Sequence, residues 1–298
     1  MRYRVTHSTK YVYQSSASLC HNVICQSPKA FPFQTVDKYE YSIKPEPNFH
    51  SERKDFFENE VVYFSVQKAH KELVVKSDSE VTLKRPNWMD INPSLTPAWE
   101  AVVKQLKSTA TLNDIRQFYL ESTYVYFVKG IREYALESFT PNRPIMEAML
   151  ELNTRIFNDF TFTPGFTEIS TPLKDVFENK KGVCQDYAHF GLACVRSIGL
   201  AAHYMSGYIE TIPPPGKPKL VGADASHAWM ALYIPEIGWV EFDSTNNLLV
   251  NDQHVRVATG RDFADVVPLK GIVYSGGKQK MVVTVDVNKI EEEIVRIN

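Results

Sequence analysis

Three residues of the chain have the types and order that thiol chemistry requires. A nucleophilic thiol needs a thiolate, a histidine that holds the proton, and a group that fixes the tautomer of that histidine. Cys184 lies in the stretch GVCQDYAHF, just after a glycine and at the start of an apolar run. This pattern predicts a helix start, where the positive end of the helix dipole favours a thiolate. His227 and Asp243 are the candidates for the second and third roles.

The helix that begins at Cys184 is predicted to run to about residue 198 and to stop at Gly199, a typical C-terminal signal. The segment FGLACV and its neighbours are apolar almost all round, which indicates a largely buried helix. Ala188 and Gly191 are small, so they would permit close packing of this helix against a sheet.

His227 opens an apolar strand and Asp243 closes the next one, so both are predicted to lie at one end of a hairpin. Side chains alternate along strands, and the register therefore decides whether the two residues share a face. Pairing Ile234 with Gly238 makes Asp243 a diagonal neighbour of His227, with about 7 Å between the backbones. The prediction is a three-residue turn at 235–237, or a bulge, which the glycine after it makes plausible.

Each of the three residues also has an ordinary structural interpretation. A cysteine at a helix start is more often a packing residue, and an aspartate at a strand end is usually a turn residue or a helix cap. The three together, in this order and each at an element terminus, favour catalysis. A metal ion held by Cys184, His189 and His227 is a weaker alternative, because a spacing of five residues on a helix suits a shared ion poorly. No metal and no cofactor are predicted.

Four further residues are candidates for lining or supporting the site. Gln185 and His189 could line the cleft, but a solvated stripe of the helix explains them too. Asp186 is interpreted as a charge that favours the helix dipole, or as a structural partner for a nearby donor. Trp229 shares the face of His227 and could shield the His–Asp pair from water, with simple core packing as the equal alternative.

The chain is expected to divide into two parts. Residues 1–88 show short alternating strands with polar or proline-bearing breaks between them, typical of an antiparallel sandwich. Composition then shifts, and residues 89–298 combine several helices with later strands. The predicted fold class is α+β, with an N-terminal antiparallel β domain followed by a core in which a central cysteine-bearing helix packs on an antiparallel sheet.

Composition excludes several classes of function. The 298 residues have a net charge of −2 and no basic block, which argues against nucleic acid as a partner. No apolar run approaches the roughly 18 residues of a membrane span, and the N-terminus has no apolar signal region. The four cysteines form no CxxC pair and no disulfide framework, so we expect a cytoplasmic protein with reduced thiols. The oligomeric state stays open.

Two stretches carry a family resemblance. GVCQDYAHFGLACVRSIGLAAHYMSGYIE, followed by DASHAWMALYIPEIGWVEFDSTNN, resembles the core of bacterial transglutaminase-like proteins, which are papain-like thiol enzymes. The β-rich residues 1–86 resemble the domain that commonly precedes this core. The resemblance implies Cys184 as nucleophile, His227 as base and Asp243 as orienting acid. The chain departs from the family at Gly199-Leu200-Ala201-Ala202-His203, where relatives often have Gly-(Leu/Ile)-Pro-Ala-Arg.

The resulting prediction is thiol-dependent acyl transfer on amide bonds, most simply hydrolysis of a peptide or amide. The partner would be a peptide or protein with an amide or glutamine group. Water or an amine can resolve the thioester, so protein–glutamine cross-linking is an alternative. A binding module that keeps the fold without turnover is the alternative from another class of protein.

Overall fold

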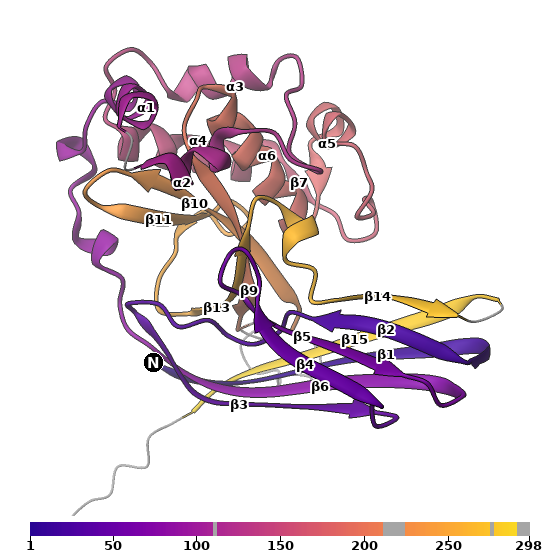
Figure 1. The fold of residues 1–298 in the computed structure, drawn as a ribbon. Coiled ribbons are helices and arrows are strands. Elements are labelled where there is room, and N and C mark those ends of the chain that lie inside the picture. The colour runs from indigo at the N-terminus through magenta and orange to yellow at the C-terminus, as the bar shows by residue number, and fades with distance from the viewer. Residues whose placement is uncertain (110–111, 211–223, 275–276, 291–298) are drawn as a thin grey trace, which may run out of the picture.

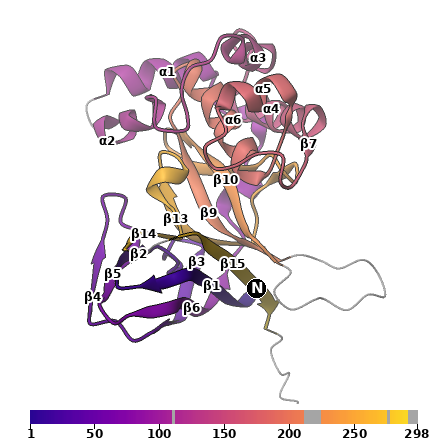
Figure 2. The same ribbon diagram turned by 90° about the vertical axis from the view of Figure 1, so that its right-hand side faces the viewer.

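The molecule has a β-sandwich below and a helical part above in the view of Figure 1. This computed structural model describes residues 1–109, 112–210, 224–274 and 277–290. A third sheet lies between the helices and the sandwich (Figure 2). The predicted α+β fold class is confirmed.

Two four-stranded antiparallel sheets form the sandwich. The first has the order β15 (Gln279–Lys289), β1 (Arg2–Ala17), β6 (His70–Leu83) and β3 (Gln34–Lys44). The second has the order β14 (Leu269–Tyr274), β2 (Leu19–Ile24), β5 (Glu60–Val66) and β4 (Phe49–Lys54). Burial alternates along the first half of β1 and through much of β6, as expected of strands with one face on a core. Cys20, Phe64 and Leu73 lie in that core and are fully buried.

The last two strands of the chain belong to the sandwich. β14 pairs with β2 from Leu269 to Tyr274, and β15 pairs with β1 from Gln279 to Lys289. The predicted division at residue 88 assigns both strands to the second part, and the pairing assigns them to the first. A division made along the sequence cannot detect that the last two strands return to the sandwich. Their place depends on which edges of β1 and β2 remain free to pair.

Short helices surround the upper part of the molecule. The chain enters it through the 3-10 turns η1 (Asn87–Asp90) and η2 (Pro93–Leu95). The outer helical elements are α1 (Trp99–Ser108), α2 (Asn113–Arg116), the 3-10 turn η4 (Gln117–Tyr119), α3 (Ile131–Ser138), α4 (Ile145–Asp159) and α5 (Leu173–Asn179). The two-residue strands β7 (Thr161–Phe162) and β8 (Lys181–Gly182) pair in parallel just before the cysteine-bearing helix.

The central sheet has five antiparallel strands. Its order is β12 (Leu248–Leu249), β11 (Gly238–Asp243), β10 (Ser226–Ile234), β9 (Ala202–Ile209) and β13 (His254–Gly260). β9 is buried from Ala202 to Tyr208, as expected of an inner strand of the sheet. β13 is an edge strand of this sheet.

The cysteine-bearing helix α6 (Cys184–Ser197) packs on this sheet as predicted. It contacts β10 and β9 on one side and α3, α4 and α5 on others, and every residue from Asp186 to Arg196 is buried. Gly191 permits the approach, because a Cβ there would lie 2.7 Å from the sulfur of Met230 on β10. Gly199 ends the helix with a φ of +88°, a conformation that favours glycine.

Two side-chain amides of the sandwich complete the open edge of β13. The amide of Gln34 donates to the carbonyl of Arg256 at 2.7 Å and accepts from its N–H at 2.8 Å. The amide of Asn59 makes the same pair of bonds with Thr259, at 2.8 and 2.9 Å. Both side chains are buried, so the two parts of the molecule share a hydrogen-bonded junction.

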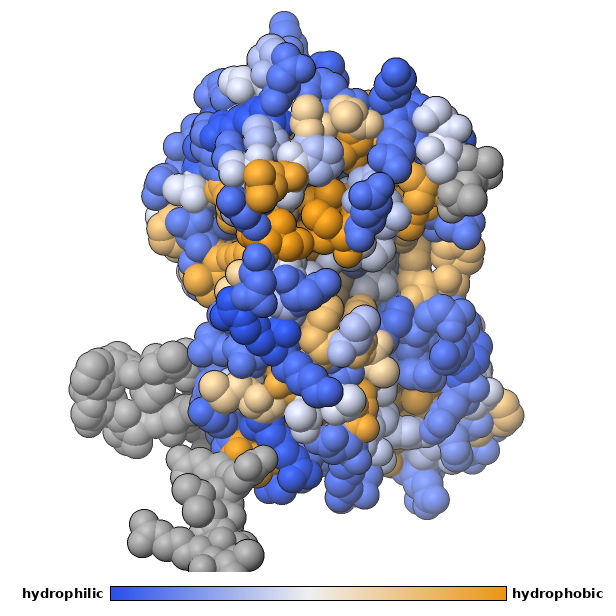
Figure 3. All heavy atoms as spheres, turned by 90° about the vertical axis from the view of Figure 1, so that its left-hand side faces the viewer, coloured by the Kyte–Doolittle hydropathy of each residue, from blue (hydrophilic) through white to orange (hydrophobic). Residues whose placement is uncertain are grey.

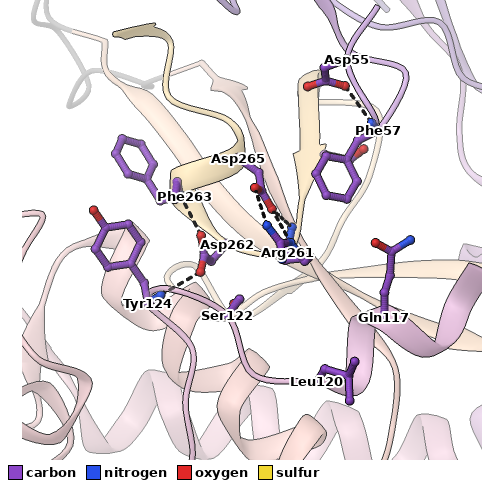
Figure 4. A network of polar contacts seen from close by, with 12 residues as sticks. Asp55, Phe57, Gln117, Leu120, Ser122, Tyr124, Arg261, Asp262, Phe263 and Asp265 are labelled. Atoms are coloured by element: carbon purple, nitrogen blue, oxygen red, sulfur yellow. Dashed lines mark hydrogen bonds and ion pairs between the residues drawn. The ribbon is translucent and has the colours of Figure 1, made fainter. Parts of the chain in front are cut away.

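A second junction forms around the 3-10 turn η5 (Phe263–Asp265), which Figure 4 shows from close by. Arg261 pairs with Asp265 at 3.0 Å, and its guanidinium lies 6.0 Å from the ring centre of Phe57 in the sandwich. The carboxylate of Asp262 accepts a hydrogen bond from the backbone N–H of Tyr124 at 2.7 Å. The junction therefore also holds the loop that precedes α3.

Apolar side chains gather on one side of the upper part, above the sandwich (Figure 3). A cavity of about 490 Å³ lies where the two parts meet, with Phe31, Phe33, Trp88 and Trp239 among its walls. None of its lining residues lines the cleft that contains Cys184.

Removing the edge amides is expected to destabilise the whole protein. Gln34→Ala and Asn59→Ala each leave a buried backbone N–H of β13 without its acceptor, so each should lower the free energy of unfolding by about 1–3 kcal/mol. Urea denaturation measures the change. Gln105→Ala, at an exposed position of α1, is the matched control and should change stability by less than about 0.5 kcal/mol. Equal losses of stability in all three variants would contradict the role given to the Gln34 and Asn59 amides at the edge of β13.

Candidate active site

The helix and the hairpin bring the three predicted residues together. Cys184 is the first residue of α6 and is half-buried, and His227 is the second residue of β10. The predicted hairpin register is confirmed, because Ile234 pairs with Gly238 and the strands continue in that phase. Gly238 has a φ of +95° after the turn, as the tight reversal requires. Asp243, the last residue of β11, thereby shares the face of His227.

Cys184 and His227 open onto a common cleft of about 390 Å³. Its remaining walls are Phe162, Ile209, Ala225, Ser226, Thr245 and Asn246. The cleft therefore combines apolar walls with a thiol, an imidazole and three small polar side chains, a composition typical of a site for an organic substrate.

The His227 ring is held between the thiol and a carboxylate. Its Nε2 donates to Oδ2 of Asp243 at 2.8 Å, which leaves Nδ1 for interactions on the other side of the ring. Burial alone would lower the pKa of His227, but the hydrogen bonds with Asp243 and Cys184 outweigh burial and raise it to about 10. The ring is therefore a cation at neutral pH, and the cation is stabilised beside the sulfur.

Asp243 is fully buried, and five contacts compensate for its charge. Oδ1 accepts from the backbone N–H groups of Thr245 and Asn246 at 3.0 and 3.2 Å. Oδ2 accepts from His227, from the Asn246 side chain at 2.7 Å and from His254 at 3.1 Å. Burial would raise the pKa of Asp243, but the bonds from both histidines hold it well below its usual range. One oxygen of Asp243 thus stabilises the turn that follows β11, and the other binds His227.

His254 and Asn246 are two partners that the sequence prediction missed. His254 begins β13 and is fully buried, while Asn246 is exposed at the cleft. The sequence holds one signal for His254, a histidine that opens a strand as His227 does. Nothing in the sequence gives its distance from Asp243, because β13 lies at the far edge of the sheet from β11. Asn246 follows Asp243 by three residues, a spacing typical of a turn that closes on its own side chain.

The side chains of His227, Asp243 and His254 converge to within 4.8 Å. Nε2 of each histidine already hydrogen-bonds to Oδ2 of Asp243. The Asn246 amide also points an N–H at the shared oxygen, and this hydrogen would face any cation there. The donor set therefore fits proton transfer better than metal binding. His189 does not join Cys184 and His227, because its Nε2 accepts from the backbone N–H of Phe263 at 3.2 Å.

Asp186 fixes the start of α6 from within. Its Oδ2 accepts from the backbone N–H of Val183 at 2.7 Å and from the hydroxyl of Thr167 at 2.6 Å. Gly182 leaves room for it, because a Cβ there would lie 2.4 Å from that same oxygen. Burial raises the pKa of Asp186, and the two hydrogen bonds oppose the rise. The side chain is thus a structural partner that holds the helix end carrying Cys184.

The other supporting candidates take different positions. Gln185 is half-buried and is not among the residues that line the cleft. His189 is buried against the ring of Tyr124, at 5.6 Å between ring centres, and burial lowers its pKa to about 3. The Trp229 ring lies 5.9 Å from that of His227 and donates its N–H to Glu241 at 2.7 Å.

Comparison with known proteins identifies the family of the chain. Residues 3–82 match the bacterial transglutaminase-like N-terminal region, and residues 133–244 match the transglutaminase-like superfamily. The chain therefore belongs to the transglutaminase-like superfamily. A protein of Mycobacterium tuberculosis described as uncharacterized is 38% identical, over 97% of this chain and 93% of its own. One of Mycobacterium leprae, described in the same way, is 29% identical over 97% of this chain and 99% of its own.

A solved structure from Cytophaga hutchinsonii, described as a "Putative Cysteine Protease", shares the fold. Its TM-score is 0.76, and the alignment covers 98% of this chain and 92% of that one at 19% identity. The likeness at this identity concerns the fold. In the part of the chain that the structure describes, no helix is long and apolar enough to span a membrane. The cytoplasmic location stays a prediction.

Removing the carboxylate should return His227 to an ordinary histidine. In wild type the ring should remain protonated at pH 8, since its pKa is raised to about 10. Asp243→Asn removes the charge, so the pKa should fall by at least about two units. NMR titration of labelled histidine rings measures both. His203 and His189 serve as internal controls and should stay neutral above pH 5, because burial lowers the pKa of each to about 3. A His227 midpoint near 6.5 in both proteins would contradict the arrangement.

The Asp186 cap should matter for stability. Asp186→Ala leaves the Val183 N–H and the Thr167 hydroxyl without their acceptor, and should lower the free energy of unfolding by about 2 kcal/mol. Asp175→Ala is the matched control, because Asp175 is an exposed acid in the first turn of α5, where no side chain caps the helix. Thermal and urea unfolding should show a change below about 0.5 kcal/mol for the control.

Proposed function

We propose that the protein is a thiol-dependent acyl transferase that hydrolyses amide bonds, with Cys184 as nucleophile, His227 as acid and base, and Asp243 as orienting group. The observation that carries the proposal is the hydrogen bond of 2.8 Å between His227 and a fully buried Asp243, on a ring that shares its cleft with Cys184. A carboxylate in this position fixes the tautomer and stabilises the imidazolium.

In the proposed first half-reaction, the Cys184 thiolate attacks the carbonyl carbon of an amide. The tetrahedral intermediate collapses when the His227 imidazolium gives its proton to the amide nitrogen and the C–N bond breaks. A thioester to Cys184 remains and an amine leaves. In the second half-reaction, neutral His227 takes a proton from water and the resulting hydroxide attacks the thioester carbonyl. The C–S bond then breaks, a carboxylic acid leaves, and the Cys184 thiolate beside the His227 imidazolium is restored.

The start of α6 supplies the proposed oxyanion donor. The first amides of a helix have no acceptor within the helix, so the N–H of Cys184 is available to a developing negative charge. The Asp186 cap occupies the Val183 N–H and so holds this turn in place. Asp186, which caps the helix, and the proposed nucleophile Cys184 therefore lie in the same first turn of α6.

The cleft supports an acyl group with an apolar side. Phe162 and Ile209 line it beside the thiol, and Phe162 is about half exposed at 51%. Ser226, Thr245 and Asn246 offer hydrogen bonds to a peptide backbone or a primary amide. A peptide or protein with an amide or glutamine group is the proposed substrate class, and the cytoplasm is its proposed location.

Cysteine labelling tests the proposal before any substrate is known. Cys184 should react with iodoacetamide far faster than the other cysteines at neutral pH, and His227→Ala should slow this reaction because it removes the imidazole that holds the thiol proton. Cys20, Cys25 and Cys194 are internal controls, because all three are buried and burial raises the pKa of each, that of Cys25 to about 12. A Cys184 as inert as Cys194 would refute the proposal.

Turnover distinguishes hydrolysis from the alternatives. Cys184→Ala should reduce cleavage of fluorogenic peptide amides by at least about a thousandfold without a change in melting temperature. Cys194→Ala, on the same helix, should lower stability and keep the activity of the folded protein. Incorporation of a dansylated amine into casein in place of hydrolysis would identify a cross-linker, and a reactive thiol with neither activity would favour a binding module.

A further inference from the structure

His254 contacts the same carboxylate oxygen as the proposed catalytic histidine. Its Nε2 lies 3.1 Å from Oδ2 of Asp243, and the Nε2 of His227 lies 2.8 Å from that atom. The side-chain amide of Asn246 also donates to Oδ2, at 2.7 Å. A carboxylate oxygen offers two lone pairs, so three donors on one oxygen compete for it.

The proton of His254 is on the nitrogen that faces Asp243. The ring is fully buried and its Nδ1 has no hydrogen-bond partner in the part of the chain that the structure describes. Burial lowers the pKa of His254 even though its Nε2–H donates to the carboxylate of Asp243, so the ring is neutral and carries one proton. A buried polar atom without a partner is unfavourable, and an apolar residue would avoid it. The contribution of the ring therefore lies at Nε2.

Packing across the sheet fixes the orientation of this ring. β13 and β10 are separated by β9, where Gly207 pairs with both His227 and Arg256. A Cβ on Gly207 would lie 2.5 Å from the Trp229 ring, so the glycine lets that ring extend across β9. Trp229 then meets His254 edge to face, with 5.2 Å between ring centres. His254 cannot turn away from Asp243 without displacing this indole.

The other charged groups near the two rings are few. Cys184 faces His227 from α6, and Arg256 lies two residues from His254 on β13. Glu241 on β11 is paired with Arg256 at 2.7 Å, which balances its charge. Asp243 is the group whose hydrogen bonds reach both rings.

We propose that His254 is a positioning residue that shares Oδ2 of Asp243 with His227 and thereby limits how tightly the carboxylate holds the His227 proton. The proposal rests on the function proposed above, in which His227 must release a proton in one half-reaction and take one up in the other. A carboxylate that served His227 alone would bind the imidazolium more strongly and slow the first half-reaction, in which His227 must release its proton. Because Oδ2 is shared, His227 can both release a proton and take one up.

The test is an NMR titration of the His227 ring in the Cys184→Ala background. The Cys184 thiol raises the pKa of His227. Its removal in this background lowers that pKa and brings the titration into an accessible range. His254→Phe should raise the His227 pKa by about one unit or more, a tenfold gain in proton affinity. His254→Gln keeps an N–H donor at nearly the same reach and should restore the pKa to within about 0.3 units of the background.

His203→Phe is the matched control, because His203 is also a buried neutral histidine of this sheet and packs on Trp239 at 4.1 Å between ring centres. It should leave the His227 pKa unchanged. If His254→Phe does not fold, His254→Asn withdraws the donor with a polar side chain and should give the same rise. An unchanged or lowered His227 pKa would overturn the proposal. Failure of the proposed function is a separate result, an unreactive Cys184 in wild type, because this titration uses no turnover.

Discussion

The buried charge of Asp243 is the constraint on which the site depends. A fully buried carboxylate is unfavourable unless several donors surround it. Here the donors come from three places: the hairpin strand with His227, the turn with Thr245 and Asn246, and the edge strand with His254. A shift in any of them would leave the charge without part of its solvation. The positions of β10, β11 and β13 are therefore linked through one side chain.

The same carboxylate gives two histidines opposite properties. His227 lies at the cleft beside Cys184, where two hydrogen bonds outweigh burial and raise its pKa. His254 lies inside and is fully buried, and burial lowers its pKa. Environment rather than residue type thus assigns one ring to proton transfer and the other to a fixed hydrogen bond.

Local patterns were sufficient to predict the first set of contacts. The glycine and the apolar run predicted where α6 begins, and strand parity predicted the hairpin register that places Asp243 beside His227. They could not reveal His254, because its role depends on a strand at the opposite edge of the sheet. For the same reason, the two C-terminal strands were assigned to the second part of the chain. Asp186 was recognised as a charge at the helix start, but its bond to Thr167 depends on how a preceding loop folds back.

The sandwich has a physical connection to the site through β13. This strand has a neighbour on one edge, and Gln34 and Asn59 occupy hydrogen-bonding positions on the other. Their bonds to the backbone of Arg256 and Thr259 fix the position of β13 relative to the sandwich. His254 is two residues from Arg256 on this strand. After β13 and the turn η5, the chain enters the sandwich as β14, which pairs with β2. Residues some 200 positions before the histidine are thus bonded to the strand that carries its ring.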